Sequence, residues 1–312
     1  MSARAVPGPR ERAGDAFFRY ATLGFGLVVV ALAVAAAWDL AAGSRLAWSK
    51  FGPAFLWGTT WDPVRETFGA LPFIYGTLVS SAIALLIAVP LGLGSAIFLA
   101  ELAPKPIADA CCFLIEILAA VPSVILGLMG IFVLVPAMRW AEPALTRSLG
   151  FIPLFRGQPY GVGLLTAGII LAFMILPYIT SISREVILTV PASLREAALA
   201  LGATRWEAVR VVVLPYAGSG IIGSVFLALS RALGETMAVT MVIGNTPKIA
   251  ASLLAPSHSM AAVIANEFAE ATSDVYIHSL IAVGLALFGI TVAINGLARL
   301  MIRRVSVKGA LI

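Results

Sequence analysis

Long apolar runs, separated by short polar segments, dominate the pattern along the chain. Each run approaches or exceeds the roughly 20 residues that a helix needs to cross the hydrocarbon core of a bilayer. The runs without a charged residue are 20–38, 67–100, 117–138, 157–183, 211–230 and 275–298. The pattern predicts an all-α polytopic membrane protein. Its six transmembrane helices are expected at about 20–42, 73–100, 112–136, 161–182, 218–245 and 277–300.

The overall composition agrees with a membrane class. Hydrophobic residues make up 60% of the 312 residues and charged residues 12%, against roughly 45–50% and about 25% in soluble domains. The formal net charge of +5 would suggest a nucleic-acid partner in a soluble chain. In a membrane protein the positions of the basic residues decide the topology instead.

The basic residues favour an orientation with both termini in the cytoplasm. Of the 21 Lys and Arg residues, thirteen then lie in cytoplasmic segments, seven in outer segments and one, Arg231, in a span. This asymmetry satisfies the positive-inside rule. We therefore expect cytoplasmic tails at 1–19 and 302–312 and a periplasmic or extracellular segment at 43–72. The Arg-rich start flanks an uncleaved first helix, because the first apolar run is too long for a signal peptide.

A polar, charged stretch at 193–215 interrupts the apolar chain. Two hydroxyl residues in it, Ser193 and Thr204, are each followed three positions later by a glutamate. That spacing predicts two capping boxes, each at the start of a helix. Gly202 lies where the first helix would need a left-handed residue to end. The stretch therefore predicts two short helices around a glycine elbow, outside the bilayer.

The same stretch matches the pattern Glu-Ala-Ala, three residues, Gly, nine residues, aliphatic, any residue, Leu-Pro. The matching residues are Glu196, Ala197, Ala198, Gly202, Leu214 and Pro215. The pattern resembles the EAA loop of the membrane subunits of ATP-binding-cassette (ABC) importers. The resemblance implies that these six residues couple the chain to a cytoplasmic ATPase, in a groove of which the loop docks. The alternative is that Glu196 merely caps a helix, which leaves the small residues and the Leu-Pro unexplained.

Two ionisable residues, Arg231 and Glu235, lie inside the predicted fifth span. One turn apart on a continuous helix, they would share a face. A charge at the bilayer centre costs roughly 2.5–3.5 kcal/mol on insertion scales, so the pair needs a partner or a wet cavity. One hypothesis is an ion pair that locks the helix in place. The other is a transport path or gate, in which Arg231 meets an anion and Glu235 holds it in place.

The run 231–245, together with 120–123, 151–157 and the segment from 184 to the coupling loop, is similar to permease subunits of bacterial phosphate-specific ABC importers. The resemblance covers roughly 70–300. It implies a type I ABC importer transmembrane domain (MetI-like) at 73–301, with one N-terminal helix before this core. It also implies that the substrate is inorganic phosphate, moved by alternating access. An arginine near a glutamate does not by itself choose an anion.

The resemblance further implies partners in the bacterial cytoplasmic (inner) membrane. These are a related permease as heterodimer partner, two copies of a cytoplasmic ATPase and an extracytoplasmic phosphate-binding protein. The chain has no Gly-x-x-x-x-Gly-Lys-Ser/Thr motif, so ATP and Mg²⁺ would be held by the ATPase and no cofactor by this chain. No catalytic or metal-ligating set is expected, because His258 and His278 lack partner motifs and lie at the outer surface or interface in this topology. The alternatives are a permease for another oxyanion such as sulfate or molybdate, a secondary transporter or channel without an ATPase, and a membrane-embedded enzyme.

Overall fold

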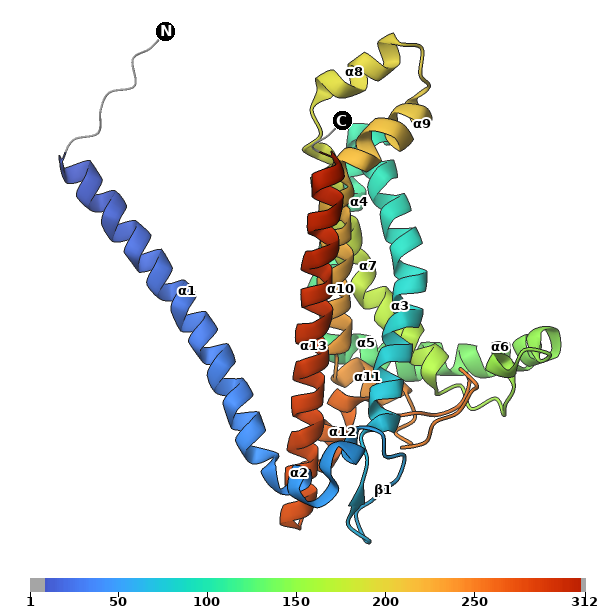
Figure 1. Cartoon of the computed structure of the whole chain (residues 1–312). Helices are drawn as coiled ribbons and strands as arrows, with labels where there is room; N and C mark the ends of the chain where they lie inside the picture. The colour runs from blue at the N-terminus through green and yellow to red at the C-terminus, as the bar shows by residue number, and fades with distance from the viewer. Residues whose placement is uncertain (1–8, 310–312) are drawn as a thin grey trace.

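The computed structural model describes residues 9–309, and the predicted all-α membrane class is confirmed (Figure 1). Six helical stretches are long and apolar enough to cross a membrane: Phe17–Gly43, Leu71–Leu102, Ser123–Leu149, Leu164–Leu188, Arg205–Leu233 and Asp274–Arg304. Helix α1 already begins at Pro9, and α13 continues to Gly309. The predicted tails are therefore partly helical, while residues 1–8 and 310–312 lie outside the described residues.

The helices and strands follow one another in the order shown by the colours of Figure 1. The helices are α1 (Pro9–Gly43), α2 (Arg45–Phe51), α3 (Leu71–Ile97), α4 (Lys105–Ala120), α5 (Ser123–Met129), α6 (Val135–Leu149), α7 (Leu164–Leu188), α8 (Ala192–Ala200), α9 (Arg205–Ala208), α10 (Leu214–Leu233), α11 (Met237–Val242), α12 (Met260–Glu267) and α13 (Asp274–Gly309). A hairpin pairs β1 (Trp61–Asp62) with β2 (Thr67–Phe68) in antiparallel register. Short 3₁₀ turns lie at Gly52–Leu56 and Pro153–Phe155. Wider π-helical turns lie at Phe98–Leu102, Gly130–Leu134 and Val209–Val213.

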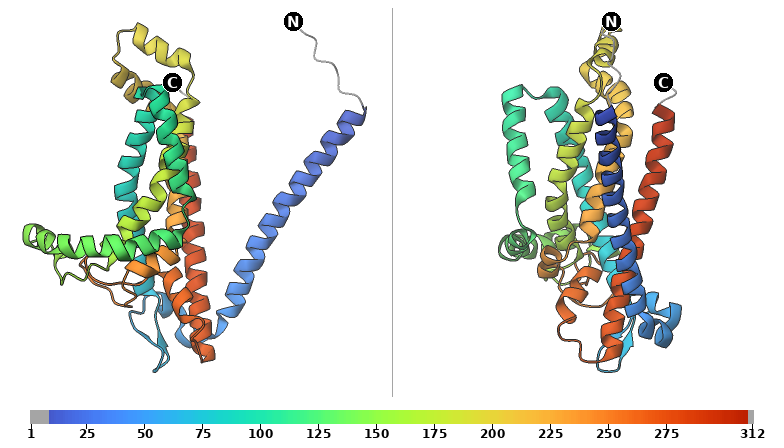
Figure 2. Two further views of the ribbon diagram at one scale, coloured as in Figure 1. Left: turned by 180° about the vertical axis from the view of Figure 1, so that it is seen from behind. Right: turned by 90° about the vertical axis from the view of Figure 1, so that its left-hand side faces the viewer.

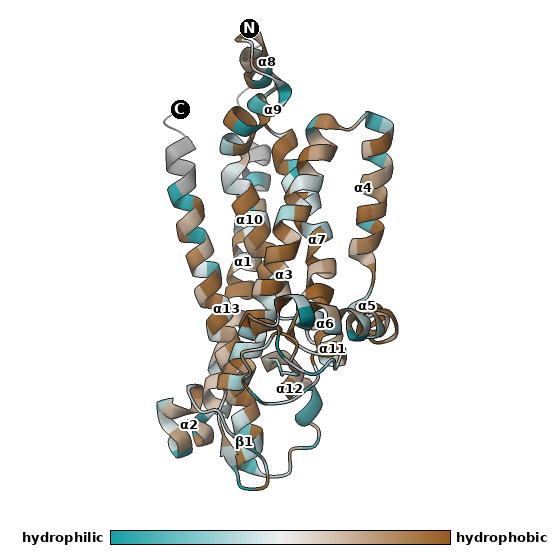
Figure 3. Ribbon diagram, turned by 90° about the vertical axis from the view of Figure 1, so that its right-hand side faces the viewer, coloured by the Kyte–Doolittle hydropathy of each residue, from teal (hydrophilic) through white to brown (hydrophobic). Residues whose placement is uncertain are grey.

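Helices α3, α7, α10 and α13 run side by side and form the bundle, with apolar residues over most of their length (Figures 1 and 3). Helix α7 is the most buried span and packs closely on α3. Two glycines permit this approach. A Cβ at Gly168 would lie 2.4 Å from a side-chain carbon of Ile83, and one at Gly92 would lie 2.9 Å from Ile179. These contacts place the apolar core between α3 and α7.

Helix α1 stands apart from this bundle. Figures 1 and 2 show it leaning away from α13, which it approaches only near its own C-terminal end. There a Cβ at Gly43 would touch Ile281, and Leu40 approaches Gly284. The expectation of one separate helix ahead of the core agrees with this arrangement.

The prediction of one continuous third span at 112–136 is wrong. Helix α4 ends at Ala120, Val121 is extended with ψ 126°, and α5 begins after Pro122. A proline disfavours the helical conformation of the residue before it, and here the chain breaks instead of kinking. From Ser123 the helix runs crosswise to the bundle as α5 and α6 (Figures 1 and 2).

The predicted bounds of the fifth span, 218–245, are also wrong. The helix is continuous from Arg205, through a π-helical turn, to Leu233. Pro215 directly follows this π-helical turn, at the second position of α10. The helix then ends at Gly234, and α11 starts separately at Met237. Arg231 and Glu235 are therefore not on one helix.

Residues 44–70 fold into a compact layer at the end of the bundle opposite α8 and α9 (Figure 1), here called the outer cap after the side of the membrane on which it is expected. Its buried aromatic rings come from both the cap and the bundle. Trp61 packs edge-on against Phe68 and Phe73, with ring centroids 4.8 and 4.7 Å away. Phe68 stacks on Tyr276 of α13. Together these rings form an apolar core between the outer cap and the bundle.

Candidate functional site

The glycine elbow of the coupling loop is present as predicted. Gly202 has φ +88°, in the left-handed region. Its N–H donates to the carbonyl of Leu199, and the N–H of Ala203 donates to the carbonyl of Ala198. These two bonds are the Schellman arrangement that ends a helix. The elbow turns the chain from α8 into α9 (Figure 1).

Only one of the two predicted capping boxes forms. The Thr204 hydroxyl accepts from the N–H of Glu207, and the Glu207 carboxylate accepts from the N–H of Thr204 at 2.7 Å. This box begins α9. The box predicted at Ser193 is wrong, because α8 already starts at Ala192 behind Pro191 and has no side-chain cap.

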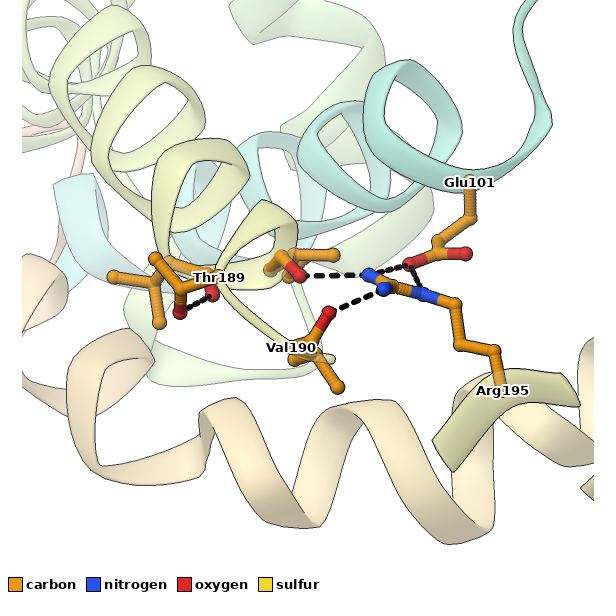
Figure 4. A network of polar contacts seen from close by, with 6 residues as sticks. Glu101, Thr189, Val190 and Arg195 are labelled. Atoms are coloured by element: carbon orange, nitrogen blue, oxygen red, sulfur yellow. Dashed lines mark hydrogen bonds and ion pairs between the residues drawn. The ribbon is translucent and has the colours of Figure 1, made fainter. Parts of the chain in front are cut away.

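One arginine holds α8 against the bundle. The guanidinium of Arg195 donates from Nε and Nη2 to Oε1 of Glu101, at 2.9 and 2.7 Å. It also donates to the backbone carbonyls of Ile187, in the last turn of α7, and of Val190, just beyond α7. Figure 4 shows the guanidinium pointing between these acceptors. The side chains of Arg195 and Glu101 are only 22% and 14% exposed. Sequence reasoning missed this pair, because the two residues are 94 positions apart and neither belongs to the EAA pattern.

The six predicted coupling residues do not all face one way. Glu196, Ala197, Gly202 and Pro215 are exposed, and Ala198 and Leu214 are half-buried. Ala197, Ala198 and Pro215 line an open, mostly apolar groove of about 630 Å³ together with Leu194, Leu201, Ala203, Glu207, Ala208, Val211, Val212 and Tyr216. Glu196, Gly202 and Leu214 lie outside its lining. The loop therefore presents an apolar groove beside an exposed carboxylate.

Arg231 and Glu235 are separated by the end of α10, and no ion pair joins them within residues 9–309. Arg231 lies in the last turn of α10, with its Cζ 4.5 Å from the ring centroid of Tyr178 on α7. The Glu235 carboxylate accepts from the N–H of Ala238, at 3.3 Å, in the first turn of α11. The hypothesis of a locking ion pair is wrong for this structure.

Two further hydrogen bonds involve residues next to Arg231. The Tyr178 hydroxyl donates to the carbonyl of Ala119 near the end of α4, at 3.4 Å. The Ser230 hydroxyl donates to Asn295 of α13, at 3.0 Å. Sequence reasoning missed Tyr178, since nothing in its local pattern distinguishes it from a packing residue.

His258 is buried, although it was expected at the outer surface or interface. Its ring packs edge-on against Phe73, and its Nδ1 accepts from the N–H of Ser259. Burial lowers the pKa of His258 from 6.5 to about 4, because a charged imidazole loses its hydration there. The histidine is therefore a neutral core residue at neutral pH.

Comparison with known proteins identifies the family that this chain resembles. Residues 88–307 match the family described as binding-protein-dependent transport system inner membrane component. The chain is 50% identical over 299 residues to the phosphate transport system permease protein PstC of Mesorhizobium japonicum, covering 94% of this chain and 91% of that protein. It is 47% identical over 305 residues to PstC of Xylella fastidiosa, covering 96% and 94%.

Solved structures resemble the fold at lower identity. One is a bacterial alginate ABC transporter, with a TM-score of 0.60 at 16% identity over 94% of this chain and 97% of that one. Another is the inward-facing MetNI methionine ABC transporter, with a TM-score of 0.52 at 20% identity over 78% and 95%. These likenesses confirm the expected MetI-like transmembrane fold.

Proposed function

The chain belongs to the binding-protein-dependent transport system inner membrane component family, and we propose that it carries inorganic phosphate into the cell as the PstC-type subunit of an importer. As a family member it is a multi-pass inner membrane permease component of an ABC transporter and not an enzyme. A separate ATPase and a substrate-binding protein are its partners, and ATP is hydrolysed on the ATPase.

The observation that carries the phosphate assignment is the identity of 46–50% to five PstC proteins over more than nine-tenths of the chain. The structure supplies chemistry that suits an oxyanion. Arg231 stands at a helix break, without a carboxylate partner within the described residues. A guanidinium binds phosphate oxygens through two parallel N–H donors.

Labelled-phosphate uptake by the complete importer, reconstituted with binding protein and ATP, tests the assignment. Uptake should depend on ATP and resist an excess of sulfate or molybdate. Transport of labelled sulfate or molybdate in place of phosphate would make the chain a permease for that oxyanion. Uptake that continues without the ATPase would instead favour a secondary transporter or channel.

The proposed complex contains a PstA-like permease as heterodimer partner and two ATPase copies, with both termini of this chain in the cytoplasm. Exposed α8 and the tip of the β1–β2 hairpin test the orientation, because they lie at opposite ends of the bundle. Single cysteines would replace Ser193 and Val64, which is 93% exposed, in a variant without Cys111 and Cys112. An impermeant thiol reagent should label only position 64 in intact cells with a permeable outer layer. Labelling of position 193 would reverse the topology.

In the proposed coupling, closure of the ATPases displaces α8, and the Arg195 contacts pass the displacement to the inner ends of α3 and α7. The docking surface contains Glu196, Ala197, Ala198, Gly202, Leu214 and Pro215. Glu196→Lys reverses an exposed charge and should weaken ATPase co-purification while leaving the membrane fold intact. Asp109→Lys, which reverses the charge of an exposed aspartate in α4, is the matched control. Equal co-purification of both variants would mean that Glu196 makes no specific contribution to ATPase docking.

We also propose that Arg231 contacts phosphate in the path, while Glu235 holds the start of α11 beside it. Since the two residues do not pair, Arg231→Gln should leave assembly intact and lower uptake at least tenfold. Arg231→Gln combined with Glu235→Gln should be no more active than Arg231→Gln alone. Uptake restored to the parent level in the double variant would contradict the path role and reinstate a structural pair.

A further inference from the structure

Two helix breaks lie next to each other in the bundle. One separates α4 from α5 at Val121 and Pro122, and the other separates α10 from α11 at 234–236. Helices α5 and α11, which follow the breaks, pack together so closely that a Cβ at Gly127 would lie 3.1 Å from the Cα of Ala238. The segments beyond the two breaks therefore form one packed unit.

Tyr178 joins the segments that precede the same two breaks. Its hydroxyl donates to the Ala119 carbonyl, one of the last four carbonyls of α4 that have no partner within the helix. Its ring lies beneath the Arg231 guanidinium in the last turn of α10. A single side chain of α7 thus contacts both α4 and α10 just before each helix ends.

The ring supports the guanidinium in a way that a carboxylate could not. An ion pair would neutralise Arg231 and occupy its N–H donors, so an incoming phosphate would have to displace the carboxylate. An aromatic face attracts the cation through its quadrupole and leaves the five N–H donors of the guanidinium unused. Arg231 is therefore held in position while its charge and donors stay available to an anion.

We propose, resting on the phosphate transport proposed above, that Tyr178 is the positioning residue for Arg231 in the phosphate path. The ring sets where the guanidinium stands at the break of α10. The hydroxyl fixes that position relative to the end of α4. Tyr178 acts through Arg231 and does not itself contact phosphate.

The test uses the complete reconstituted importer and measures phosphate uptake and ATP hydrolysis in the same vesicles. Tyr178→Leu should lower uptake about fivefold, the scale of a lost cation–π contact to an exposed cation such as Arg231. ATP hydrolysis stimulated by the binding protein should stay within twofold, so less phosphate is moved per ATP. Tyr178→Phe keeps the ring and should retain at least half of the parent uptake. Equal loss in the Phe and Leu variants would overturn the role of the ring.

A double-mutant cycle separates positioning from packing. If Tyr178 acts through Arg231, adding Tyr178→Leu to Arg231→Gln should cause no further loss of uptake, because coupled residues are non-additive. Independent, multiplying losses would overturn the proposal. Tyr75→Leu is the matched control, since the Tyr75 hydroxyl also donates to a backbone carbonyl, that of Ala250, but its ring carries no cation among the described residues. It should not change the phosphate moved per ATP.

The test also covers a variant that fails to assemble and a parent complex that transports another oxyanion. If Tyr178→Leu fails to assemble, Tyr178→Met takes its place, and failure of both would show a structural role and overturn the proposal. If the parent complex transports another oxyanion, the phosphate assignment fails, but the same cycle with that anion still tests Tyr178.

Discussion

The two ends of the bundle differ in how tightly the segments outside the long helices are packed. At one end, α8 buries none of its side chains, and the side chain of Arg195 connects it to the bundle. At the other end, the outer cap buries a cluster of aromatic rings against α3 and α13. Trp61 and Tyr276 of that cluster both donate to the carboxylate of Glu267. Helix α8 is thus open to a partner, while the outer cap is closed upon itself.

This difference indicates which region contributes most to the stability of the chain and which region can transmit movement. Many apolar contacts make a unit that opens only with the whole fold, whereas a segment with few buried contacts moves at low cost. Substitutions in the outer cap should therefore change the stability of the chain. Substitutions in the coupling loop should change coupling and leave stability nearly unaltered.

The largest effect is expected from Trp61→Ala. Trp61 is 9% exposed, contacts several rings and donates to Glu267 at 2.8 Å, and removal of such a side chain costs about 3–5 kcal/mol. The thermal midpoint of the purified chain in nanodiscs should fall sharply. Trp57→Ala is the matched control, because Trp57 is 73% exposed in the same segment. Equal effects of the two variants would contradict a packed outer cap.

Acid should also lower the stability of the chain, because His258, which is buried against Phe73, becomes protonated. Because the folded pKa of about 4 lies below the ordinary value of 6.5, the unfolded chain binds more protons between these values, and stability falls as the pH decreases through them. The loss approaches about 3 kcal/mol at the low end of this window. Thermal midpoints from pH 7 to pH 4 measure it. His258→Asn should flatten this part of the profile, and an unchanged slope would mean that another group titrates.

A smaller change in stability, but a clear loss of coupling, is expected for Arg195→Ala. The substitution leaves Glu101 and the carbonyls of Ile187 and Val190 without this donor. Hydrogen bonds to charged groups contribute about 1.5–3 kcal/mol, and partial exposure places this pair at the lower end. Phosphate moved per ATP should fall more than the thermal midpoint. Arg205→Ala, an exposed arginine of α9, is the control, and identical behaviour would mean that α8 has other anchors.

The smallest change in stability is expected for Gly202→Leu. No atom lies within 4 Å of a Cβ at this position, so the cost comes from the left-handed backbone alone, about 1–2 kcal/mol. The strain is confined to the elbow between α8 and α9. ATPase docking should weaken while the thermal midpoint of the membrane domain stays constant. A large fall in that midpoint would show that the elbow is part of the folded core.

Sequence patterns predicted the long apolar helices and the glycine elbow at Gly202 because both depend on local features. Apolar runs of sufficient length define the spans, and Gly202 and Thr204 carry their own turn and cap chemistry. The breaks at Pro122 and Gly234 could not be located, since a proline or glycine in a span either kinks or ends a helix depending on its neighbours. Arg195 with Glu101, and Tyr178 with Arg231, are contacts between distant segments. The aromatic core of the outer cap is of the same kind.

Because of the π-helical turns, the relative orientation of neighbouring helices depends on the exact number of residues between them. Each such turn holds one residue more than an α-helical turn would, and two of them lie next to the segments proposed to couple the chain to the ATPase. Glu101 lies within Phe98–Leu102, and α9 passes into α10 through Val209–Val213. Deletion of one residue from Val209–Val213 would restore a regular α-helix and rotate α9 about the helix axis by about 100° relative to α10. The groove beside α8 would then face a different direction, although every remaining side chain is unchanged. A one-residue deletion here would thus disturb docking more than most single substitutions.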